Sequence, residues 1–339
     1  MIQDISNDFL DYQYQILGIS PLLERQDVTE ICINKPGQVY LETFNGWECI
    51  EVSTLTYERA RQFCTSVVNE SNTGQRITDK EPMVSLTFPS GQRAQFVIPP
   101  ACDAGKISIT IRQPSKYTKT LEQYQEDGFF NNVILNTDSI SKYDLELKEL
   151  LINRKYGEFF SKAVLYRKNI VVAGATGSGK TTFMKSLVNH IPFDERLITI
   201  EDARELFIPQ PNVVHLLYSK GGQSASNITA KSCMEACLRM KPDRILLAEV
   251  RGGETYDFLN VISSGHNGSM TSCHAGSIES CYNRLVMMAM QNDMARTIGK
   301  DMILDIVKTV IDLIIVFKKH EGKRKVIEYI YDGKVAKVS

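Results

Sequence analysis

The sequence lacks several features that would mark other classes of protein. None of its eight cysteines forms a C-x-x-C pair, the spacing of many zinc and redox sites, so we expect packed, reduced thiols as in a reducing cytosol. Basic residues are not in excess, because 39 Lys and Arg stand against 40 Asp and Glu, for a formal net charge of −1. A dedicated nucleic-acid binder usually has a basic excess, so this balance disfavours that class.

Long apolar runs are absent as well. The most apolar late stretch, Ile303–Phe317, carries Asp305, Lys308 and Asp312, and it is too short and too charged to span a bilayer. The first residues, Met1–Asp8, are acidic rather than basic, which disfavours a signal peptide. We therefore expect a soluble, cytoplasmic protein.

The apolar material that is present suffices for two domains. Hydrophobic residues make up 43% of the 339-residue chain and charged residues 23%, which is typical of globular proteins. We predict an α+β N-terminal domain over residues 1–115, a polar linker over 116–144 and a larger domain over 145–339. In the first domain we predict a hairpin, a helix and three further strands, over 30–42, 56–69, 83–88, 93–98 and 106–112. The last strand alternates isoleucine with polar residues, which predicts a sheet with one solvated face.

The second domain alternates short apolar runs with helical segments. The apolar runs cover residues 169–173, 196–201, 244–250, 269–273 and 313–317, and helical spacing precedes them at 145–152 and 159–165. Such alternation is typical of a mainly parallel sheet that helices cover on both faces. The predicted fold class is therefore α/β, preceded by the smaller α+β domain.

A glycine-rich motif directly follows the first of these runs. It matches the P-loop pattern G-x-x-x-x-G-K-[ST] and consists of Gly174, Ala175, Thr176, Gly177, Ser178, Gly179, Lys180 and Thr181, with Thr182 next. Glycines let backbone N–H groups turn inward around a phosphate, and the helix expected near Lys180 adds its positive N-terminal end. Lys180 is expected to reach the β- and γ-phosphates, and the Thr181 hydroxyl to bind Mg²⁺. The motif predicts binding of ATP or GTP.

Hydrolysis also needs a carboxylate near the attacking water, and two acidic strand ends supply candidates. Glu201 and Glu205 lie at the end of one apolar run, and Glu249 lies at the end of another, where a Walker-B acid belongs. Ligands of open α/β sheets bind at the carboxyl ends of the strands, so these groups can converge on the P-loop. His274 follows a third apolar run, and its imidazole is suited to hydrogen-bond a γ-phosphate.

The motifs resemble, in order and spacing, the Walker A, Asp, Walker B and His boxes of secretion ATPases. The four boxes are Gly174–Thr181, Ile200–Glu205, Arg244–Glu254 and Gly265–His274. Three stretches of the first domain, 91–95, 98–101 and 109–115, are also similar to the type IV secretion traffic ATPases, the VirB-eleven family. The resemblance covers most of the chain and implies a RecA-like P-loop ATPase domain behind a smaller N-terminal domain.

The resemblance implies a role for each matched residue of the second domain. Lys180 and Thr181 would bind phosphate and Mg²⁺. Glu205, with Glu201 beside it, would serve the attacking water or the metal. Glu249 would be the Walker-B carboxylate, which meets Mg²⁺ directly or through water.

The remaining implied roles concern sensing and charge stabilisation. His274 would be the γ-phosphate sensor. Arg93 and Arg112 match N-terminal-domain arginines that reach a nucleotide lying between the two domains. Arg239 is a weaker candidate for the same work. A surface salt bridge is the alternative role for all three arginines.

The resemblance also implies a hexameric ring that works with other secretion ATPases and inner-membrane channel components, in the cytoplasm or peripherally at the inner membrane. ATP hydrolysis would then power a type IV secretion or conjugation machine, in pilus assembly or substrate translocation. A pilus retraction or type II secretion motor shares the same boxes, although the type II members often carry a four-cysteine module that is absent here. A nucleic-acid-translocating ring is the alternative of another class, but nucleic acid is not expected as a direct ligand. A nucleotide-gated scaffold without turnover is a further alternative.

Overall fold

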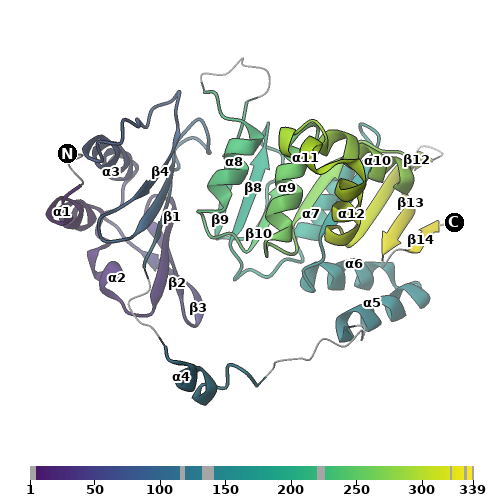
Figure 1. Cartoon of the computed structure of the whole chain (residues 1–339), viewed down its shortest axis with the longest axis horizontal. Coiled ribbons are helices and arrows are strands. Elements are labelled where there is room, and N and C mark those ends of the chain that lie inside the picture. Colours follow the sequence, from purple (N-terminus) through teal and green to yellow (C-terminus); the bar gives the residue numbers. More distant parts are fainter. Residues whose placement is uncertain are drawn as a thin grey trace.

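Two β-sheets organise the chain, one on each side of the predicted linker (Figure 1). The computed structural model describes residues 5–114, 119–131, 141–219, 226–320, 323–331 and 334–337. The first domain holds an antiparallel sheet in the order β3-β2-β1-β6-β5-β4. Its elements are α1 (Asn7–Leu17), α2 (Ser20–Glu24), β1 (Val28–Lys35), β2 (Gln38–Thr43), β3 (Gly46–Glu51), α3 (Tyr57–Glu70), β4 (Met83–Thr87), β5 (Arg93–Val97) and β6 (Ser108–Arg112).

The second domain holds a mainly parallel sheet in the order β14-β13-β12-β7-β11-β10-β8-β9. The strands from β12 to β9 in this order run parallel, and β13 and β14 add an antiparallel edge. Its helices are α5 (Lys142–Ile152), α6 (Tyr156–Leu165), α7 (Lys180–Val188), α8 (Ala230–Cys237), α9 (Glu254–Ser263), α10 (Ile278–Ala289), α11 (Asp293–Ile298) and α12 (Lys300–Val310). Its strands are β7 (Ile170–Gly174), β8 (Leu197–Glu201), β9 (Val213–Leu217), β10 (Arg244–Leu247), β11 (Met270–Cys273), β12 (Leu313–His320), β13 (Lys323–Tyr331) and β14 (Lys334–Lys337).

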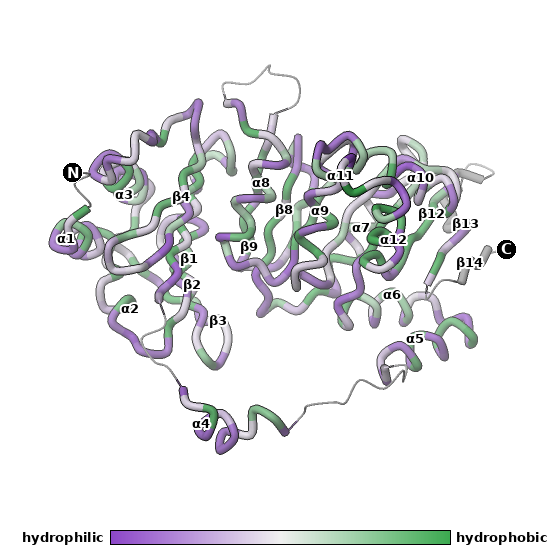
Figure 2. The backbone as a smooth tube through the Cα atoms, viewed as in Figure 1, coloured by the Kyte–Doolittle hydropathy of each residue, from purple (hydrophilic) through white to green (hydrophobic). Residues whose placement is uncertain are grey.

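Helices cover both faces of the second sheet, as the apolar runs predicted. On β7, Val171 and Ala173 join a core that includes residues of α8, α9, α10 and α12. The alternate residues Ile170 and Val172 join a second core built with α5, α6 and α7. Hydrophobic residues accordingly run through the central strands in Figure 2. Because both faces are apolar and buried, the strand order, and with it the position of every strand end, is fixed from two sides.

Most predicted elements are confirmed, but four strands were not predicted. The hairpin, the helix at 57–70 and the five predicted strands of the second sheet all form. Sequence patterns did not predict β3, β9, β13 or β14. The predicted linker contains a short helix, α4 (Leu121–Glu126), which the Thr120 side chain caps, and α5 begins inside its predicted end. Residues 115–118 and 132–140 of that predicted linker lie outside the described residues.

The prediction of a solvated face on the first sheet is wrong. Ser108 and Thr110, on the face expected to be solvated, are buried, and so is Cys32 on the neighbouring strand. This face packs against the second domain, where Arg196 Nη2 donates to Thr110 Oγ1 at 3.4 Å. Small polar side chains are typical of a solvated face when a strand is taken alone, but here another domain covers them.

A buried arginine joins the two domains. Arg196, just before β8, is fully buried, and its Nη1 donates to Asn34 Oδ1 at 2.8 Å and to Asn212 Oδ1 at 2.7 Å. Its Nε donates to the Met240 carbonyl at 2.8 Å, and its guanidinium lies 5.8 Å from the ring centroid of Trp47. Burial of a charged group is unfavourable unless its donors are matched, so these acceptors hold the domains in one arrangement.

Further polar contacts extend this interface. Trp47 Nε1 donates to Asp243 Oδ2 at 3.0 Å, and that oxygen also accepts the backbone N–H of Arg196 at 2.7 Å. Lys241 Nζ lies 2.6 Å from Glu42 Oε1, which forms an ion pair across the same boundary. These contacts attach the first domain to the second near the start of β8 and β9.

The cysteines and the helices agree with the expectation of packed, reduced thiols and with the lack of long apolar runs in the sequence. All eight cysteines are free, and only Cys49 among them is exposed. Cys273 Sγ and Cys281 Sγ lie 3.4 Å apart without a disulfide. Within the described ranges, no helix combines the length and apolar character needed to cross a membrane.

Substitution of Arg196 with Met should destabilise the fold. The apolar side chain leaves the oxygens of Asn34 and Asn212 buried with fewer donors, so we expect the free energy of unfolding to fall by about 3 kcal/mol. Urea denaturation followed by circular dichroism measures the change. Arg239→Met, which alters an exposed arginine of the same domain, is the matched control and should leave the midpoint unchanged. Equal midpoints for the two variants would contradict this role of Arg196.

Candidate functional site

The parallel strands bring four predicted motifs to one edge of the second sheet. The P-loop follows β7, Glu201 ends β8, Glu249 follows β10 and His274 follows β11. Registers of β7 with β11, β11 with β10 and β10 with β8 are all parallel, so these carboxyl ends lie side by side. The site therefore depends on strand order as much as on the individual motifs.

The P-loop has the backbone that its glycines permit. A Cβ atom at Gly174 would lie 2.5 Å from Ser178 Oγ and 2.8 Å from the Phe317 carbonyl oxygen, so no larger residue fits there. Gly177 and Gly179 have φ values of 72° and 101°, which side chains disfavour. Helix α7 starts after Gly179 without a side-chain cap, so the N–H groups of its first turn stay available to an anion.

Lys180 bends back over this loop. Its Nζ donates to the carbonyl oxygens of Gly174 at 3.0 Å and Ala175 at 3.1 Å, and it lies 3.4 Å from His274 Nδ1. Burial lowers the pKa of Lys180, and the nearby Glu249 carboxylate acts in the opposite direction. The buried Ser178 Oγ has no hydrogen-bond partner in the described part of the chain. The oxygens of a phosphate could accept hydrogen bonds from the Lys180 ammonium and the Ser178 hydroxyl.

His274 and Glu249 continue the contact across the strand ends. His274 Nε2 lies 2.8 Å from Glu249 Oε1, while the other ring nitrogen faces Lys180. The Glu249 oxygen receives no hydrogen bond of good geometry, so the contact is a close approach rather than an aligned hydrogen bond. Burial raises the pKa of Glu249, the negative charges of Asp202 and Glu205 add to the rise, and His274 and Lys180 lower it.

Arg251 and Asp202 are site residues to which the sequence patterns gave no role. Arg251 Nη2 lies 2.6 Å from Glu249 Oε2, and Arg251 Nη1 lies 2.6 Å from Asp202 Oδ2. The guanidinium therefore bridges carboxylates that follow two neighbouring strands. Asp202 directly follows Glu201 and Arg251 comes two residues after Glu249, but a contact between strand ends leaves no periodic signal in a sequence.

Glu201 and Glu205 have different surroundings. Glu201 is fully buried, and its Oε1 accepts hydrogen bonds from Thr199 Oγ1 at 2.7 Å and Arg204 Nη1 at 3.1 Å. Its Oε2 accepts the backbone N–H groups of Glu205 and Leu206, each at 2.7 Å. The Glu205 side chain is exposed. The geometry favours Glu205 over Glu201 as the group available to a bound molecule.

The charge of Glu201 is strongly stabilised. Burial alone would raise the pKa of Glu201, but the nearby His215 ring, 3.7 Å from Oε1, and the hydrogen bonds from two backbone N–H groups bring it to about 2. Arg204 also pairs with Asp103 of the first domain, with Nε 3.0 Å from Asp103 Oδ1. Glu201 thus holds the turn after β8 and, through Arg204, connects the site with the first domain.

The three candidate arginines lie away from the P-loop within one chain. Arg93 and Arg112 are paired opposite each other on β5 and β6, and Arg112 Nε lies 3.7 Å from Glu30 Oε1. Among the described residues, no hydrogen bond or ion pair joins either of them to the P-loop. Arg239 is exposed in the turn that leads into β10, at the amino ends of the strands.

Comparison with known proteins gives one consistent result. Residues 17–325 match the family described as Type II/IV secretion system protein. The type IV secretion system protein VirB11 of Brucella abortus is 45% identical over 325 residues, which cover 94% of this chain and 89% of the relative. The type IV secretion system protein PtlH of Bordetella pertussis is 36% identical over 331 residues, which cover 94% of this chain and 95% of the relative.

A solved structure agrees with these relatives. The crystal structure of the VirB11 ATPase from the Brucella suis type IV secretion system, in complex with sulphate, has a TM-score of 0.88 and 44% sequence identity. The match covers 95% of this chain and 97% of that one. These similarities do not favour a retraction motor, a type II motor or a nucleic-acid ring. Together with the P-loop and its strand-end carboxylates, they identify the chain as an ATP hydrolase of the Type II/IV secretion system protein family, and within it as a member of the VirB11 ATPases of type IV secretion systems.

Proposed function

We propose that this chain is the subunit of a homohexameric motor whose ATP hydrolysis powers a type IV secretion or conjugation machine. The work would be pilus assembly or substrate translocation. The observation that carries the proposal is the continuous contact from Lys180 through His274 to Glu249, with successive distances of 3.4 and 2.8 Å. This contact links Lys180, which binds phosphate, to the Walker-B carboxylate of Glu249. Loss of a γ-phosphate can therefore change the position of Glu249 at the end of β10.

The residues divide the chemistry among them. Lys180 and the backbone of Gly174–Thr182 bind the phosphates, and Lys180 then exchanges its two carbonyl acceptors for phosphate oxygens. Glu205, exposed beside Glu249, orients the attacking water and accepts a hydrogen bond from it. His274 hydrogen-bonds the γ-phosphate and reports its departure.

The donor set fits Mg²⁺ that arrives with the nucleotide. Thr181 offers a hydroxyl in the first turn of α7, and Glu249 Oε1 is a buried acceptor without a hydrogen bond. In the described part of the chain, no cluster of three His, Cys, Asp or Glu residues is arranged to hold a metal alone, and Mg²⁺ is usually bound by one or two protein groups together with phosphates. Thr181, Glu249 and Glu205 would hold it, directly or through water. The ion would neutralise charge that develops on the phosphate oxygens.

Ring formation would supply what one chain lacks. We assign Arg93 and Arg112 to the transition-state charge at a nucleotide between two domains. An arginine in that position can contribute about 10³–10⁵ in rate. Since neither contacts the P-loop within this chain, a neighbouring subunit or a closing motion of the first domain would have to bring them there.

We expect the partners to be further copies of this chain, other secretion ATPases and inner-membrane channel components. The location would be the cytoplasm, with peripheral contact to the inner membrane. The near-zero net charge supports protein partners over nucleic acid as the direct ligand.

Mg²⁺-dependent ATP hydrolysis, measured per chain across protein concentration, tests the motor. Activity per chain should rise as chains associate, because each site needs a neighbour. Lys180→Ala should abolish turnover, because the β- and γ-phosphates lose their point charge. Normal turnover in Lys180→Ala would refute the site. A rate that does not change with concentration while mass measurements show dissociated chains would refute the ring.

Two conservative substitutions separate the roles of Glu205 and Glu201. Glu205→Gln should lower kcat by about 10²–10⁴ with little change in nucleotide affinity or thermal midpoint. Glu201→Gln should lower the thermal midpoint, because the amide replaces one of two oxygens that accept hydrogen bonds in the interior.

The pH dependence of stability checks the second assignment. The pKa of Glu201 is about 2 in the folded chain against an ordinary value of 4.5. Its contribution is therefore present above pH 4.5 and is lost as the pH falls toward 2. Unfolding curves should show this loss in the wild type and a smaller loss in Glu201→Gln, and identical pH profiles would contradict the assignment.

Arg112→Ala should slow turnover more than it weakens nucleotide binding, because the side chain acts mainly on transition-state charge. Steady-state kinetics and equilibrium binding of a fluorescent ATP analogue measure the two effects. Lys80→Ala alters an exposed cation of the same domain and should change neither. Equal losses in kcat and affinity for Arg112→Ala would make the arginine a simple binding residue.

A further inference from the structure

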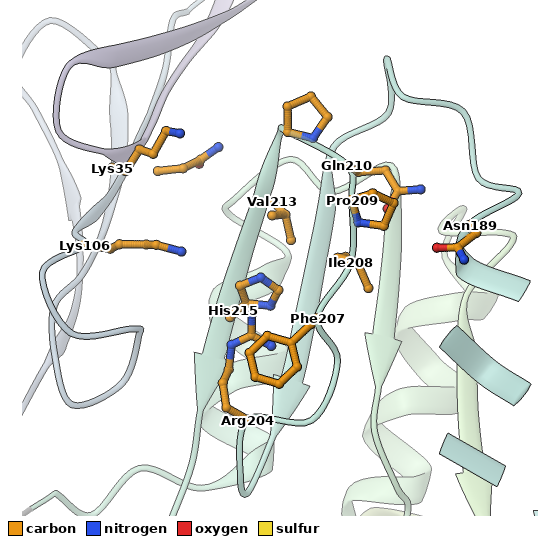
Figure 3. Close-up of a pocket in the computed structure, with 12 residues that line it drawn as sticks. Lys35, Lys106, Asn189, Arg204, Phe207, Ile208, Pro209, Gln210, Val213 and His215 are labelled. Atoms are coloured by element: carbon orange, nitrogen blue, oxygen red, sulfur yellow. The ribbon is translucent and has the colours of Figure 1, made fainter. Parts of the chain in front are cut away.

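A groove separates the first domain from the outer edge of β9. It has a volume of about 610 Å³ and lies away from the P-loop. Figure 3 shows Lys35 and Lys106 of the first domain on one side, with Val213 and His215 of β9 across from them. The residues that line it are Asn34, Lys35, Lys106, Asn189, Arg204, Phe207, Ile208, Pro209, Gln210, Pro211, Val213 and His215.

The lining of the groove is basic. None of the residues that line it is acidic. Lys35 is exposed, and its ammonium forms no ion pair within the described residues. Lys106 and Arg204 both pair with Asp103, at 2.8 and 3.0 Å, so one carboxylate is shared between two cations. Arg204 also pairs with Glu201. In the described part of the chain, Lys35 is therefore the cation without a carboxylate partner, and Lys106 shares its partner with Arg204.

One side of β9 has unused backbone groups. The Leu197 N–H donates to the Asn212 carbonyl, and the Tyr218 N–H donates to the Glu201 carbonyl. Even-numbered residues of β9 therefore bond to β8, and the odd-numbered ones point their backbone groups away from it. The Val213 and His215 N–H groups have no backbone partner in the described chain.

The first domain already uses this edge at one end. The Leu217 N–H donates to the Ala101 carbonyl at 2.9 Å, and Cys102 forms an isolated bridge with Leu216. The groove continues the line of that bridge along β9.

The other end of the open edge is also closed. Asn34 Nδ2 donates to Asn212 Oδ1 at 2.9 Å, and Pro209 and Pro211 before it have no N–H to offer. Between Asn212 and Leu216 the open edge spans ~13 Å, at about 3.3 Å per residue. This length suits three or four residues of an extended chain.

We propose that this groove binds a short, extended, acidic segment of a partner protein. The segment adds to β9 through backbone hydrogen bonds with Val213 and His215, and its carboxylates pair with Lys35 and Lys106. An exposed strand edge favours such β-addition, and alternate side chains supply selectivity. Charge complementarity selects an acidic partner, because the lining contains no carboxylate, Lys35 has no ion-pair partner in the described chain, and Lys106 shares Asp103 with Arg204.

Fluorescence anisotropy with labelled hexapeptides tests the proposal on the full chain. The probes are a peptide of alternating Glu and Val, its Lys and Val counterpart, and two forms of the acidic peptide that are N-methylated at odd or at even positions. We expect the acidic peptide to bind at least tenfold more tightly than the basic one. One N-methylated form, and only one, should lose at least tenfold in affinity, because only one set of amides can face β9.

Charge reversal provides the matched test on the protein. The double substitution Lys35→Glu and Lys106→Glu should lower the affinity for the acidic peptide at least tenfold and leave basal ATP hydrolysis unchanged. The control substitution Lys80→Glu should change neither the affinity nor the hydrolysis. The proposal is overturned if the reversal has no effect on binding, if both N-methylated forms bind like the parent, or if the acidic peptide does not bind. Displacement by inorganic phosphate or by single-stranded DNA at concentrations equal to those of the peptide would also overturn it, because the groove would then be a general anion site.

Discussion

The parallel direction of four strands determines where the functional groups of this chain meet. Since β7, β11, β10 and β8 run the same way, their carboxyl ends share one edge, and the groups that follow them meet without any long loop. Both faces of these strands are buried, so a strand cannot shift without exposing apolar residues from one of the two cores. The close contacts of Lys180, His274 and Glu249 are consequences of that packing rather than of local flexibility.

Local sequence patterns predicted the parts of this arrangement that depend on short stretches of neighbouring residues. Glycine spacing predicted the P-loop, and apolar runs predicted the strands that carry Glu249 and His274. The run Val213–Leu217 forms β9, but it was not predicted, and the exposed fraction of β6 was misjudged because domain contacts decide it. The bridge from Arg251 to two strand ends joins residues 49 positions apart, so it requires the fold to be known.

The two domains and the site are joined through charge. Arg204 contacts Glu201 at the end of β8 and Asp103 of the first domain, at 3.1 and 3.0 Å. Surface ion pairs contribute little, but Glu201 is fully buried and takes four donors, so the turn that carries Glu205 cannot move independently of Arg204. Movement of the first domain would therefore change the position of Glu205, and a bound nucleotide would act back on the first domain through the same contacts.

The place of the first domain also determines what one subunit can do alone. It packs against β9, and four strand spacings of about 4.8 Å separate β9 from β7, which amounts to ~19 Å across the sheet. That distance exceeds the reach of an arginine side chain, so Arg93 and Arg112 cannot meet a nucleotide at the P-loop while Arg196 holds the domains as they are. Since the buried contacts of Arg196 oppose domain separation, the smaller rearrangement is the approach of another subunit's first domain. If Arg93 and Arg112 act on the transition state as proposed, assembly would be part of completing the catalytic site.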